Sequence, residues 1–345
     1  MWTGGFAVVT ADSRVRRYVE AAIRGAEWLA NRQLKDGSIR PELGLGPMYK
    51  AVAALAYAGK VVEANRLLNW LRDKALIRPG EFKLTFNPES SDGAGTAFYP
   101  NAWIMLGSLK LMRFDVASVE AMDGLSRYQV GCGGFMSTLE GGRVDILNTA
   151  MGGWISLYYG RIAQAERAGQ LLRRMAELQP EPGKLYYVYD CWSDDLLRAI
   201  PENRWMTHVV DTSKPEQHFY HSGIAMVLLS DLYKATGKTG YLEAAEEVYF
   251  KISSSSKAES FRWPSKCKDG WGAALLYQAT GRSEHRLLAE KVADKTFLET
   301  QGRDGGWKGF HAPLTDDYSE KVEVSAEELT AEFVFELLEI AKCLA

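Results

Sequence analysis

The sequence predicts an all-α fold, an (α/α)6 toroid in which an inner ring of six helices lies inside an outer ring of six. Two observations predict it. One helix–turn–helix join recurs along the chain, and the helices divide into an apolar set and an amphipathic set. Because no linker rich in Pro or Ser interrupts this pattern, we expect one domain over residues 1–345.

The recurring join has an apolar helix with Tyr near its end, then Gly and a basic residue, then an alanine-rich amphipathic helix. Glycine can adopt the left-handed conformation that ends a helix and reverses the chain. Successive joins lie about 45–55 residues apart, apart from one interval of 77 residues that holds an insertion at about 180–216. The join glycines are Gly59, Gly160, Gly237 and Gly281, and a fifth join has Met112 in this place.

An apolar period of about 3.6 residues predicts the helices in order. Helices that are apolar nearly all round have to be buried on every side, which an inner ring provides. The predicted inner helices are 47–58, 97–112, 145–159, 217–236, 270–280 and 325–343. The predicted outer helices are 13–33, 60–76, 114–129, 161–178, 239–254 and 283–300. An open α-solenoid is the alternative, but it would need more polar residues on its inner helices.

Composition limits what the chain binds. A net charge of −3 without a basic run argues against nucleic acid or anionic lipid as partner. No segment has ~18 uninterrupted apolar residues, so we expect no membrane insertion, and the sequence carries no pattern that sets the oligomeric state. The N-terminal residues lack the features of a signal peptide, and the four cysteines show no CxxC pair or disulfide framework. Together these features predict a cytoplasmic protein.

In a toroid the loops that enter the inner helices open at one end, so their residues form one rim. This rim is aromatic and has few charges, which is typical of a pocket for an apolar small molecule. The insertion at 180–216 is rich in tyrosine, and we expect it near the cavity mouth with Asp190 in contact with substrate. The other predicted substrate-binding residues are Tyr49, Tyr99, Asn101, Trp103, Asn148, Tyr220 and Trp271.

Three outer helices end in similar motifs. QLKDGSI (33–39), YQVGCGGF (128–135) and TQGRDGGW (300–307) each have Gln, a glycine turn and an apolar residue. They resemble the QW motifs of the terpenoid cyclase and protein prenyltransferase superfamily, in which Gln and the aromatic residue tie neighbouring outer helices together. The resemblance implies the same toroid and an isoprenoid-like substrate.

Two further segments, GGFMSTLEGGRVDIL and KPEQHFYHSGIA, resemble the zinc-site segments of protein prenyltransferase β subunits. In that family Asp, Cys and His bind the catalytic zinc, and they correspond here to Asp145, Leu147 and His221. Leucine cannot bind zinc, and two protein ligands fall short of the three that a catalytic site needs. Cys191 or Cys267 would have to take its place. We therefore expect no metal and no cofactor.

The strong-acid motif of class II terpene cyclases, DxDD, is also missing. At a helix N-terminus Asp145 is expected to be ionised and His221 near neutral. Paired, the two side chains would suit proton abstraction and return. The sequence therefore predicts an enzyme that cyclises or isomerises an isoprenoid or polyene, with Asp145 and His221 as catalytic residues. The alternative for Asp145 is a structural role as a helix N-cap.

Two other function classes stay open. (α/α)6 rings also host glycan hydrolases, lyases and epimerases, and such an enzyme would use Asp145 together with Asp269, Glu327 or Glu328 as paired carboxylates. The third class is a binding module or a subunit that needs a partner chain. A dry cavity would favour an isoprenoid substrate, and a cavity lined by carboxylates would favour a sugar substrate.

Overall fold

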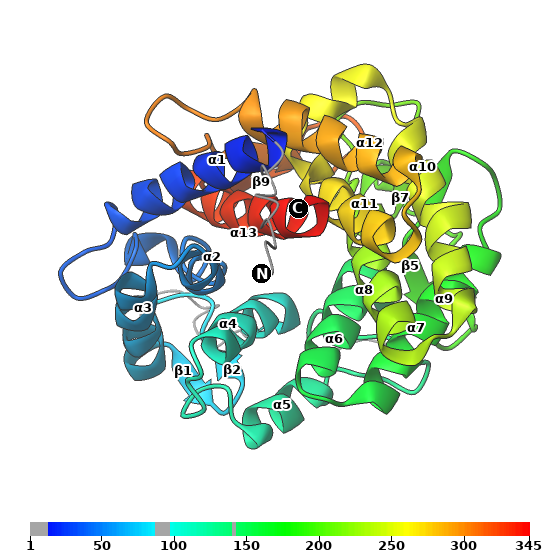
Figure 1. Cartoon of the computed structure of the whole chain (residues 1–345). Helices are drawn as coiled ribbons and strands as arrows, with labels where there is room; N and C mark the ends of the chain where they lie inside the picture. The colour runs from blue at the N-terminus through cyan, green and yellow to red at the C-terminus, as the bar shows by residue number, and fades with distance from the viewer. Residues whose placement is uncertain (1–12, 87–96, 140–142) are drawn as a thin grey trace, which may run out of the picture.

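The computed structural model describes residues 13–86, 97–139 and 143–345, and its helices form two concentric rings (Figure 1). Each inner helix is buried along nearly its whole length, as its apolar sequence requires. The inner helices are α2 (Ala51–Tyr57), α4 (Phe98–Lys110), α6 (Ile146–Tyr158), α8 (Tyr220–Thr236), α11 (Cys267–Thr280) and α13 (Ala326–Leu344). The predicted fold class is confirmed.

The outer helices bury one face and expose the other. Two of them continue through a π-helical stretch, so that α9, η3 and α10 make one rod and α12 and η6 make another. They are α1 (Ser13–Ala30), α3 (Val61–Lys74), α5 (Val119–Ser126), α7 (Ile162–Glu177), α9 (Thr239–Ala244) with η3 (Ala245–Phe250) and α10 (Lys251–Ser255), and α12 (Ser283–Val292) with η6 (Ala293–Leu298). None of the described helices is long and apolar enough to cross a membrane.

The two ends of the chain close the ring. The last helix, α13, packs against α2 on one side and α11 on the other, and the first helix, α1, covers α13 from outside. An open solenoid would leave its terminal repeats apart, so the alternative architecture is wrong. Some helices begin later than predicted. α2 begins at Ala51 after a turn, and α5 begins at Val119 because Ser118 caps it.

The joins adopt the predicted conformation. All four join glycines have φ between 69° and 78°, in the left-handed region. Met112, which replaces glycine in the fifth join, also has a positive φ of 55°. Because each join follows the C-terminus of an inner helix and Asp145 lies at the N-terminus of α6, the joins lie on the face of the ring opposite Asp145.

The QW-like motifs form three equivalent contacts, which we call the glutamine clamps. The side-chain amides of Gln33, Gln129 and Gln301 each donate two hydrogen bonds of 2.8–3.0 Å. One goes to the carbonyl of the glycine four residues on, and the other to a carbonyl of the next outer helix around the ring. The clamps therefore join α1 to α3, α5 to α7 and η6 to α1, as the motif resemblance implies.

Aromatic side chains fill the centre of the ring. Phe335 of α13 contacts four other rings edge-on, with centroid distances of 4.6–6.2 Å. These rings belong to Tyr57, Trp103, Trp154 and Trp271. The middle of the toroid is thus a packed core rather than an open cavity.

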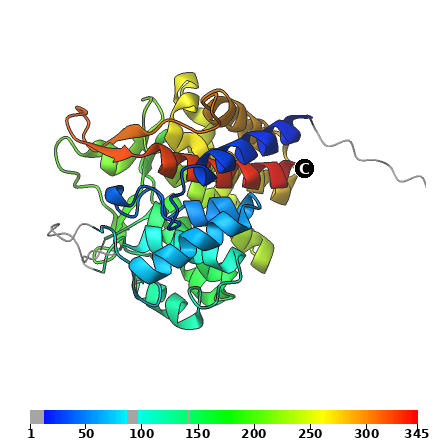
Figure 2. The same cartoon turned by 90° about the vertical axis from the view of Figure 1, so that its left-hand side faces the viewer.

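Short antiparallel strands occur in the loops at the end where the inner helices begin (Figure 2). They pair as β1 with β2, β3 with β5 and β6, β4 with β7, and β8 with β9. Their bounds are β1 (Leu76–Arg78), β2 (Glu81–Phe82), β3 (Arg143–Asp145), β4 (Lys184–Tyr186), β5 (Val188–Asp190), β6 (Asp195–Leu196), β7 (Val209–Asp211), β8 (Phe310–Pro313) and β9 (Lys321–Val324). These strands shape the loops, and the helices still form both layers.

The glycines of the clamps and of the joins should differ in their tolerance of alanine. Gly133 and Gly160 both have positive φ, but a Cβ on Gly133 would lie 2.5 Å from the Arg167 carbonyl oxygen, whereas Gly160 has nothing within 4 Å. We expect Gly160→Ala to lower the free energy of unfolding by about 1–2 kcal/mol through backbone strain alone. Gly133→Ala should cost about 1–3 kcal/mol more, because the clamp has to shift. Urea unfolding of both variants checks this, and equal losses would contradict the clamp geometry.

Candidate functional site

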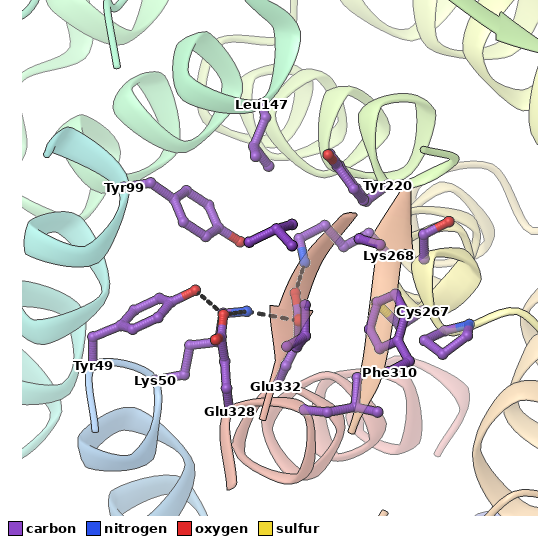
Figure 3. A pocket seen from close by; sticks show the side chains of 16 residues that line it. Tyr49, Lys50, Tyr99, Leu147, Tyr220, Cys267, Lys268, Phe310, Glu328 and Glu332 are labelled. Atoms are coloured by element: carbon purple, nitrogen blue, oxygen red, sulfur yellow. Dashed lines mark hydrogen bonds and ion pairs between the residues drawn. The ribbon is translucent and has the colours of Figure 1, made fainter. Parts of the chain in front are cut away.

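A pocket of about 180 Å³ lies at the end of the ring where the inner helices begin (Figure 3). Its walls come from the entries to the inner helices and from the β8–β9 hairpin. It is lined by Tyr49, Lys50, Tyr99, Leu147, Tyr220, Pro264, Ser265, Cys267, Lys268, Phe310, Ala312, Val322, Val324, Glu328, Leu329 and Glu332. Three predicted substrate-binding residues, Tyr49, Tyr99 and Tyr220, are therefore in the pocket wall.

Four charged side chains, Lys50, Lys268, Glu328 and Glu332, form the floor of this pocket, and Glu336 lies beneath them; we call these five residues the charged cluster. Glu328, Glu332 and Glu336 follow one another at intervals of four residues, so they lie on one face of α13. Lys50 lies directly before α2, and Lys268 lies in the first turn of α11. The cluster thus joins three inner helices that adjoin one another in the ring.

The lysines bridge the carboxylates. Lys50 Nζ lies 3.1 Å from Glu328 Oε1 and 2.7 Å from Glu332 Oε2. Lys268 Nζ pairs with Glu332 and lies 2.9 Å from Glu336 Oε1. An ammonium group has three N–H donors, so these contacts leave each lysine one donor for a ligand.

The surroundings shift the pKa values of the two buried acids of the cluster in opposite directions. Burial works to raise the pKa of Glu332, but the ammonium groups of Lys268 and Lys50 outweigh it and lower that pKa. Glu336 is deeper, and burial raises its pKa to about 7 although Lys268 opposes the change. Both lysines keep pKa values well above the ordinary one, since the attraction of the carboxylates outweighs the effect of burial.

The tyrosines add neutral hydrogen-bonding groups. Tyr49 donates a hydrogen bond of 2.5 Å from its hydroxyl to Glu328 Oε1. Burial raises the pKa of Tyr99 and of Tyr220. At ordinary pH these phenols therefore stay protonated, and each can donate to or accept from a polar ligand.

Asp145 is the N-cap of α6. Its carboxylate accepts hydrogen bonds of 2.8 Å from the Asn148 backbone N–H and 2.7 Å from the Asn148 side-chain amide. The capping alternative is thus realised. Burial raises the pKa of Asp145, and this effect exceeds that of the two Asn148 bonds, which work to keep it ionised.

His221 lies in the first turn of α8, stacked on Tyr187 with a centroid distance of 3.7 Å. Its Nδ1 is buried and has no hydrogen-bond partner among the described residues. Burial lowers its pKa well below the usual value, so the expectation of a neutral imidazole holds. The described structure has no hydrogen bond between His221 and Asp145, so the expected pair is not formed. Whether either residue acts in catalysis stays a prediction.

The other predicted residues lie away from the pocket. Trp103 and Trp271 are several residues inside their helices, so at 1.5 Å per residue they lie below the rim, in the aromatic core. Asn101 accepts a hydrogen bond from the Phe82 backbone N–H, and Asn148 is engaged by Asp145. These positions are structural in the described contacts and none of them lines the pocket.

The segments over the pocket differ from the expected arrangement. The β8–β9 hairpin lines the pocket with Phe310, Val322 and other residues, while no residue of 180–216 does. The insertion instead packs against the turn of this hairpin, where Asp316 accepts hydrogen bonds of 2.8–2.9 Å from two backbone N–H groups at 205–206. The hairpin is therefore the cover, and the insertion supports it from outside.

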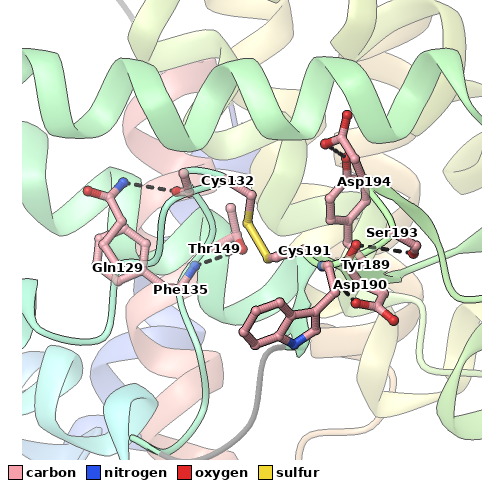
Figure 4. Close-up of a disulfide and its surroundings, with 11 residues drawn as sticks. Gln129, Cys132, Phe135, Thr149, Tyr189, Asp190, Cys191, Ser193 and Asp194 are labelled. Atoms are coloured by element: carbon pink, nitrogen blue, oxygen red, sulfur yellow. Dashed lines mark hydrogen bonds between the residues drawn. A yellow bond between two sulfur atoms is a disulfide. The ribbon is translucent and has the colours of Figure 1, made fainter.

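Asp190 lies at the end of β5, beside a disulfide between Cys132 and Cys191 (Figure 4). Its Oδ1 accepts a hydrogen bond from the Trp192 N–H, and it does not line the pocket. The expectation of unpaired cysteines is wrong for this pair. The two cysteines are 59 residues apart in sequence and meet only in the fold, which their spacing alone does not reveal.

Of the carboxylates that a sugar enzyme would need, Glu328 alone among the predicted ones lines the pocket. Asp269 is fully buried in an ion pair of 2.6 Å with Lys266. Glu327 points to Arg32 and Arg40, at 3.6 and 3.7 Å.

Sequence reasoning missed the rest of the charged cluster. A signal was present: three glutamates at intervals of four in a predicted inner helix, and a lysine at the start of two other inner helices. A glutamate buried in such a helix needs a positively charged partner in the folded protein, because buried carboxylates are costly when unpaired.

The residues that resemble a prenyltransferase zinc site do not fit zinc. Asp145 is held by Asn148, Leu147 offers no ligand and His221 is stacked on Tyr187. Ligand atoms of Cys267, Glu332 and Glu336 do lie within 4.8 Å of one another. However, the Lys268 ammonium already bridges the two carboxylates in this group.

No family model matches this chain, and no curated protein matches it in sequence. Solved structures do resemble it in fold. A D-mannose isomerase has a TM-score of 0.66 at 12% identity, covering 96% of this chain and 98% of its own. An α-1,6-mannanase, GH76A of Salegentibacter sp. HEL1_6, has a TM-score of 0.59 at 12% identity, covering 95% and 99%. The type II terpene cyclase MstE from Scytonema has 0.60 at 12%, covering 96% and 99%.

These comparisons agree on the fold. Neighbours with different activities share the (α/α)6 toroid with this chain, so the comparisons confirm the predicted fold and give no support to an isoprenoid specificity over the others.

Removing Lys268 should destabilise the protein, because the buried Glu332 and Glu336 would lose the cation that they share. We expect Lys268→Met to lower the free energy of unfolding by about 3–5 kcal/mol near pH 7. The loss should shrink as the pH falls toward about 5, since protonated acids need no cation. Urea unfolding at several pH values measures this.

Lys295→Met is the matched control, because Lys295 forms an exposed ion pair with Glu299 and its loss should leave the unfolding midpoint nearly unchanged. Equal effects of the two substitutions would show that the charged cluster contributes no more than a surface pair.

Proposed function

We propose that this protein is an enzyme that moves a proton within a small hydroxylated substrate of the sugar class, as an isomerase, epimerase or lyase does. The observation that carries this proposal is the charged floor of the pocket, in which carboxylates, ammonium groups and tyrosine hydroxyls converge. Sugars present many hydroxyl groups, and such groups are recognised by side chains of this kind.

The size of the pocket supports a small substrate. A volume of about 180 Å³ holds about six water molecules at ~30 Å³ each. Drug-sized ligands occupy pockets of about 300–1,000 Å³. One sugar ring suits this space better than a folded polyene does.

The geometry favours proton transfer next to a carbonyl group. The Glu328 carboxylate lines the pocket, so it can take a proton from a carbon of the substrate. The free N–H donors of Lys50 and Lys268 can stabilise the oxygen on which negative charge develops. Returning the proton to a neighbouring carbon gives an isomer, and expelling a leaving group gives an unsaturated product.

Glycoside hydrolysis fits less well. It needs a protonated carboxylic acid beside the scissile bond, on the opposite side of the sugar from a second carboxylate. Here Glu328 and Glu332 lie on the same helix face, bridged by Lys50, and the lysines lower the pKa of Glu332. The solved neighbours that act on sugars include an isomerase as well as a mannanase, which is consistent with either outcome on this fold.

Isoprenoid cyclisation is the second candidate, favoured by the likeness to the MstE terpene cyclase and by the tyrosines of the pocket wall. Its weakness is the charged floor. The aromatic residues that would stabilise a carbocation, Trp103 and Trp271, are packed in the core.

A substrate panel tests the proposal. The purified chain is incubated with aldoses, ketoses and unsaturated uronides, and separately with polyprenyl substrates, and the products are followed by NMR. Turnover of a sugar is expected, and Glu328→Gln should lower kcat by about 10²–10⁴-fold through loss of the base. Glu327→Gln is the matched control, because Glu327 does not line the pocket, and it should keep activity. Turnover of polyprenyl substrates alone would overturn the proposal.

Asp145 and His221 are proposed to position the pocket wall, since they adjoin Leu147 and Tyr220, which line it. Asp145→Asn and His221→Ala should each lower kcat at least ~10-fold, a barrier increase of ~1.4 kcal/mol. The free energy of unfolding should change by only ~1–2 kcal/mol. Trp103→Ala is the contrast, because loss of a buried aromatic residue should cost about 3–5 kcal/mol. Full activity in both polar variants would leave them with the cap and packing roles alone.

A further inference from the structure

The charged cluster has more acids than bases. Three carboxyl groups face two ammonium groups, so full ionisation would leave one negative charge without a partner. The neighbouring Tyr49, Tyr99 and Tyr220 are neutral, and burial keeps His221 neutral too. A buried site does not hold an uncompensated charge cheaply, so one more positive charge is needed.

The uncompensated charge would cost most at Glu336. The Glu328 side chain is 17% exposed and reaches water, whereas the Glu336 side chain is fully buried. Moreover, Glu336 Oε2 has no hydrogen-bond partner among the described residues. An ionised oxygen in that place would have no strong hydrogen-bond donor, because the neighbouring Cys267 thiol is a weak one, so this acid is the member of the cluster that benefits most from a proton.

Few groups around Glu336 can respond to its charge. They are Lys268 and Cys267 from α11 and Glu332 from its own helix. Of these, Lys268 and Cys267 both interact with Glu336 and line the pocket. A thiol is a weak hydrogen-bond donor, whereas the Lys268 ammonium group is a strong one and lies 2.9 Å from Glu336 Oε1, so Lys268 is the better connection between the buried acid and a bound substrate.

We propose that Glu336 holds the spare proton of the charged cluster and supplies it, through Lys268, to the substrate oxygen in the pocket. Glu336 is a positioning residue here, since it acts through Lys268. The use of this proton rests on the proposed function, but its presence does not.

The transfer balances without another reactant. An N–H bond of Lys268 breaks as the O–H bond of the substrate forms. The Glu336 carboxyl group turns its protonated oxygen toward Nζ, and its O–H bond breaks as the lysine N–H bond is restored. Glu336 is left as a carboxylate beside the ammonium group, and the reverse transfers restore the cluster when the substrate carbonyl re-forms. The raised pKa of Glu336, about 7, suits an acid that gives and regains a proton near neutral pH.

Infrared spectroscopy of the full chain without substrate tests the presence of the proton. We expect a C=O stretching band of a protonated carboxyl group at pH ~6 that disappears as the pH rises through about 7. The band should be absent in Glu336→Gln. It should also be absent in Glu332→Gln, although Glu336 is retained there, because removing one carboxylate lets Glu336 ionise against the two lysines.

Lys50→Met gives an opposite change and serves if Glu332→Gln does not fold. Lys50 does not contact Glu336, but its removal deepens the charge deficit, so the band should persist to higher pH. Thermal unfolding gives a second readout. The folded pKa lies above the unfolded value of 4.5, so the Tm of the wild type should fall relative to that of Glu336→Gln as the pH rises from ~5 to ~8.

Several outcomes would overturn the proposal. A wild-type spectrum without the band at pH ~6 would show that Glu336 is ionised, and a band that persists in Glu332→Gln would show that its proton does not depend on charge balance. One metal ion per chain, lost in Glu336→Gln, would show that a cation other than a proton fills the deficit. If the band behaves as expected but no sugar is turned over, the proposed function is wrong, while the presence of the proton on Glu336 remains supported. If a sugar is turned over and Glu336→Gln keeps the wild-type pH profile, the relay through Lys268 fails.

Discussion

The closure of the ring by α13 is the constraint on which the rest of the structure depends. Lys50 and Glu332 are 282 residues apart in sequence, and they form an ion pair only because the last inner helix packs beside the first. Until the ring closes, each of these groups would have to remain in water. The pocket and its charged floor therefore need residues from both ends of the chain, and no single repeat can form them alone.

Buried ion pairs seldom add net stability, because removing two charges from water costs about as much as their attraction returns. They are more useful for fixing alignment. The glutamates of α13 are one helical turn apart, so a shift of this helix by a turn would pair each lysine with the wrong acid. We infer that the charged cluster sets the position of α13 along the ring axis, while the aromatic rings around Phe335 supply the apolar contacts.

The architecture was predictable because the sequence signals that determine it are short and recur from repeat to repeat. Four of the five joins carry their own glycine, and each clamp carries its own Gln and glycine turn, so each of these repeats can be recognised without the others. The site was predictable in part. The rule that helix entries converge correctly placed Tyr49, Tyr99 and Tyr220 in the pocket wall. It failed for Trp103 and Trp271, because these residues lie further along their helices, in the core. The predicted ring already makes α11 and α13 neighbours, but the pairing of Lys268 with Glu336 also depends on how far along the ring axis each helix lies, and the sequence pattern does not give that position.

The glutamine clamps are spread unevenly, and this has a consequence for how the protein can change. In the part of the chain that the structure describes, they join α1 to α3, α5 to α7 and η6 to α1, so the seams α3–α5, α7–α9 and α10–α12 of the outer ring lack them. The long insertion lies at one such seam, between α7 and α9. A seam without a clamp has no fixed loop geometry to preserve, so it can accept extra chain. New loops, and with them new covers for the pocket, can thus arise at these seams without disturbing the ring.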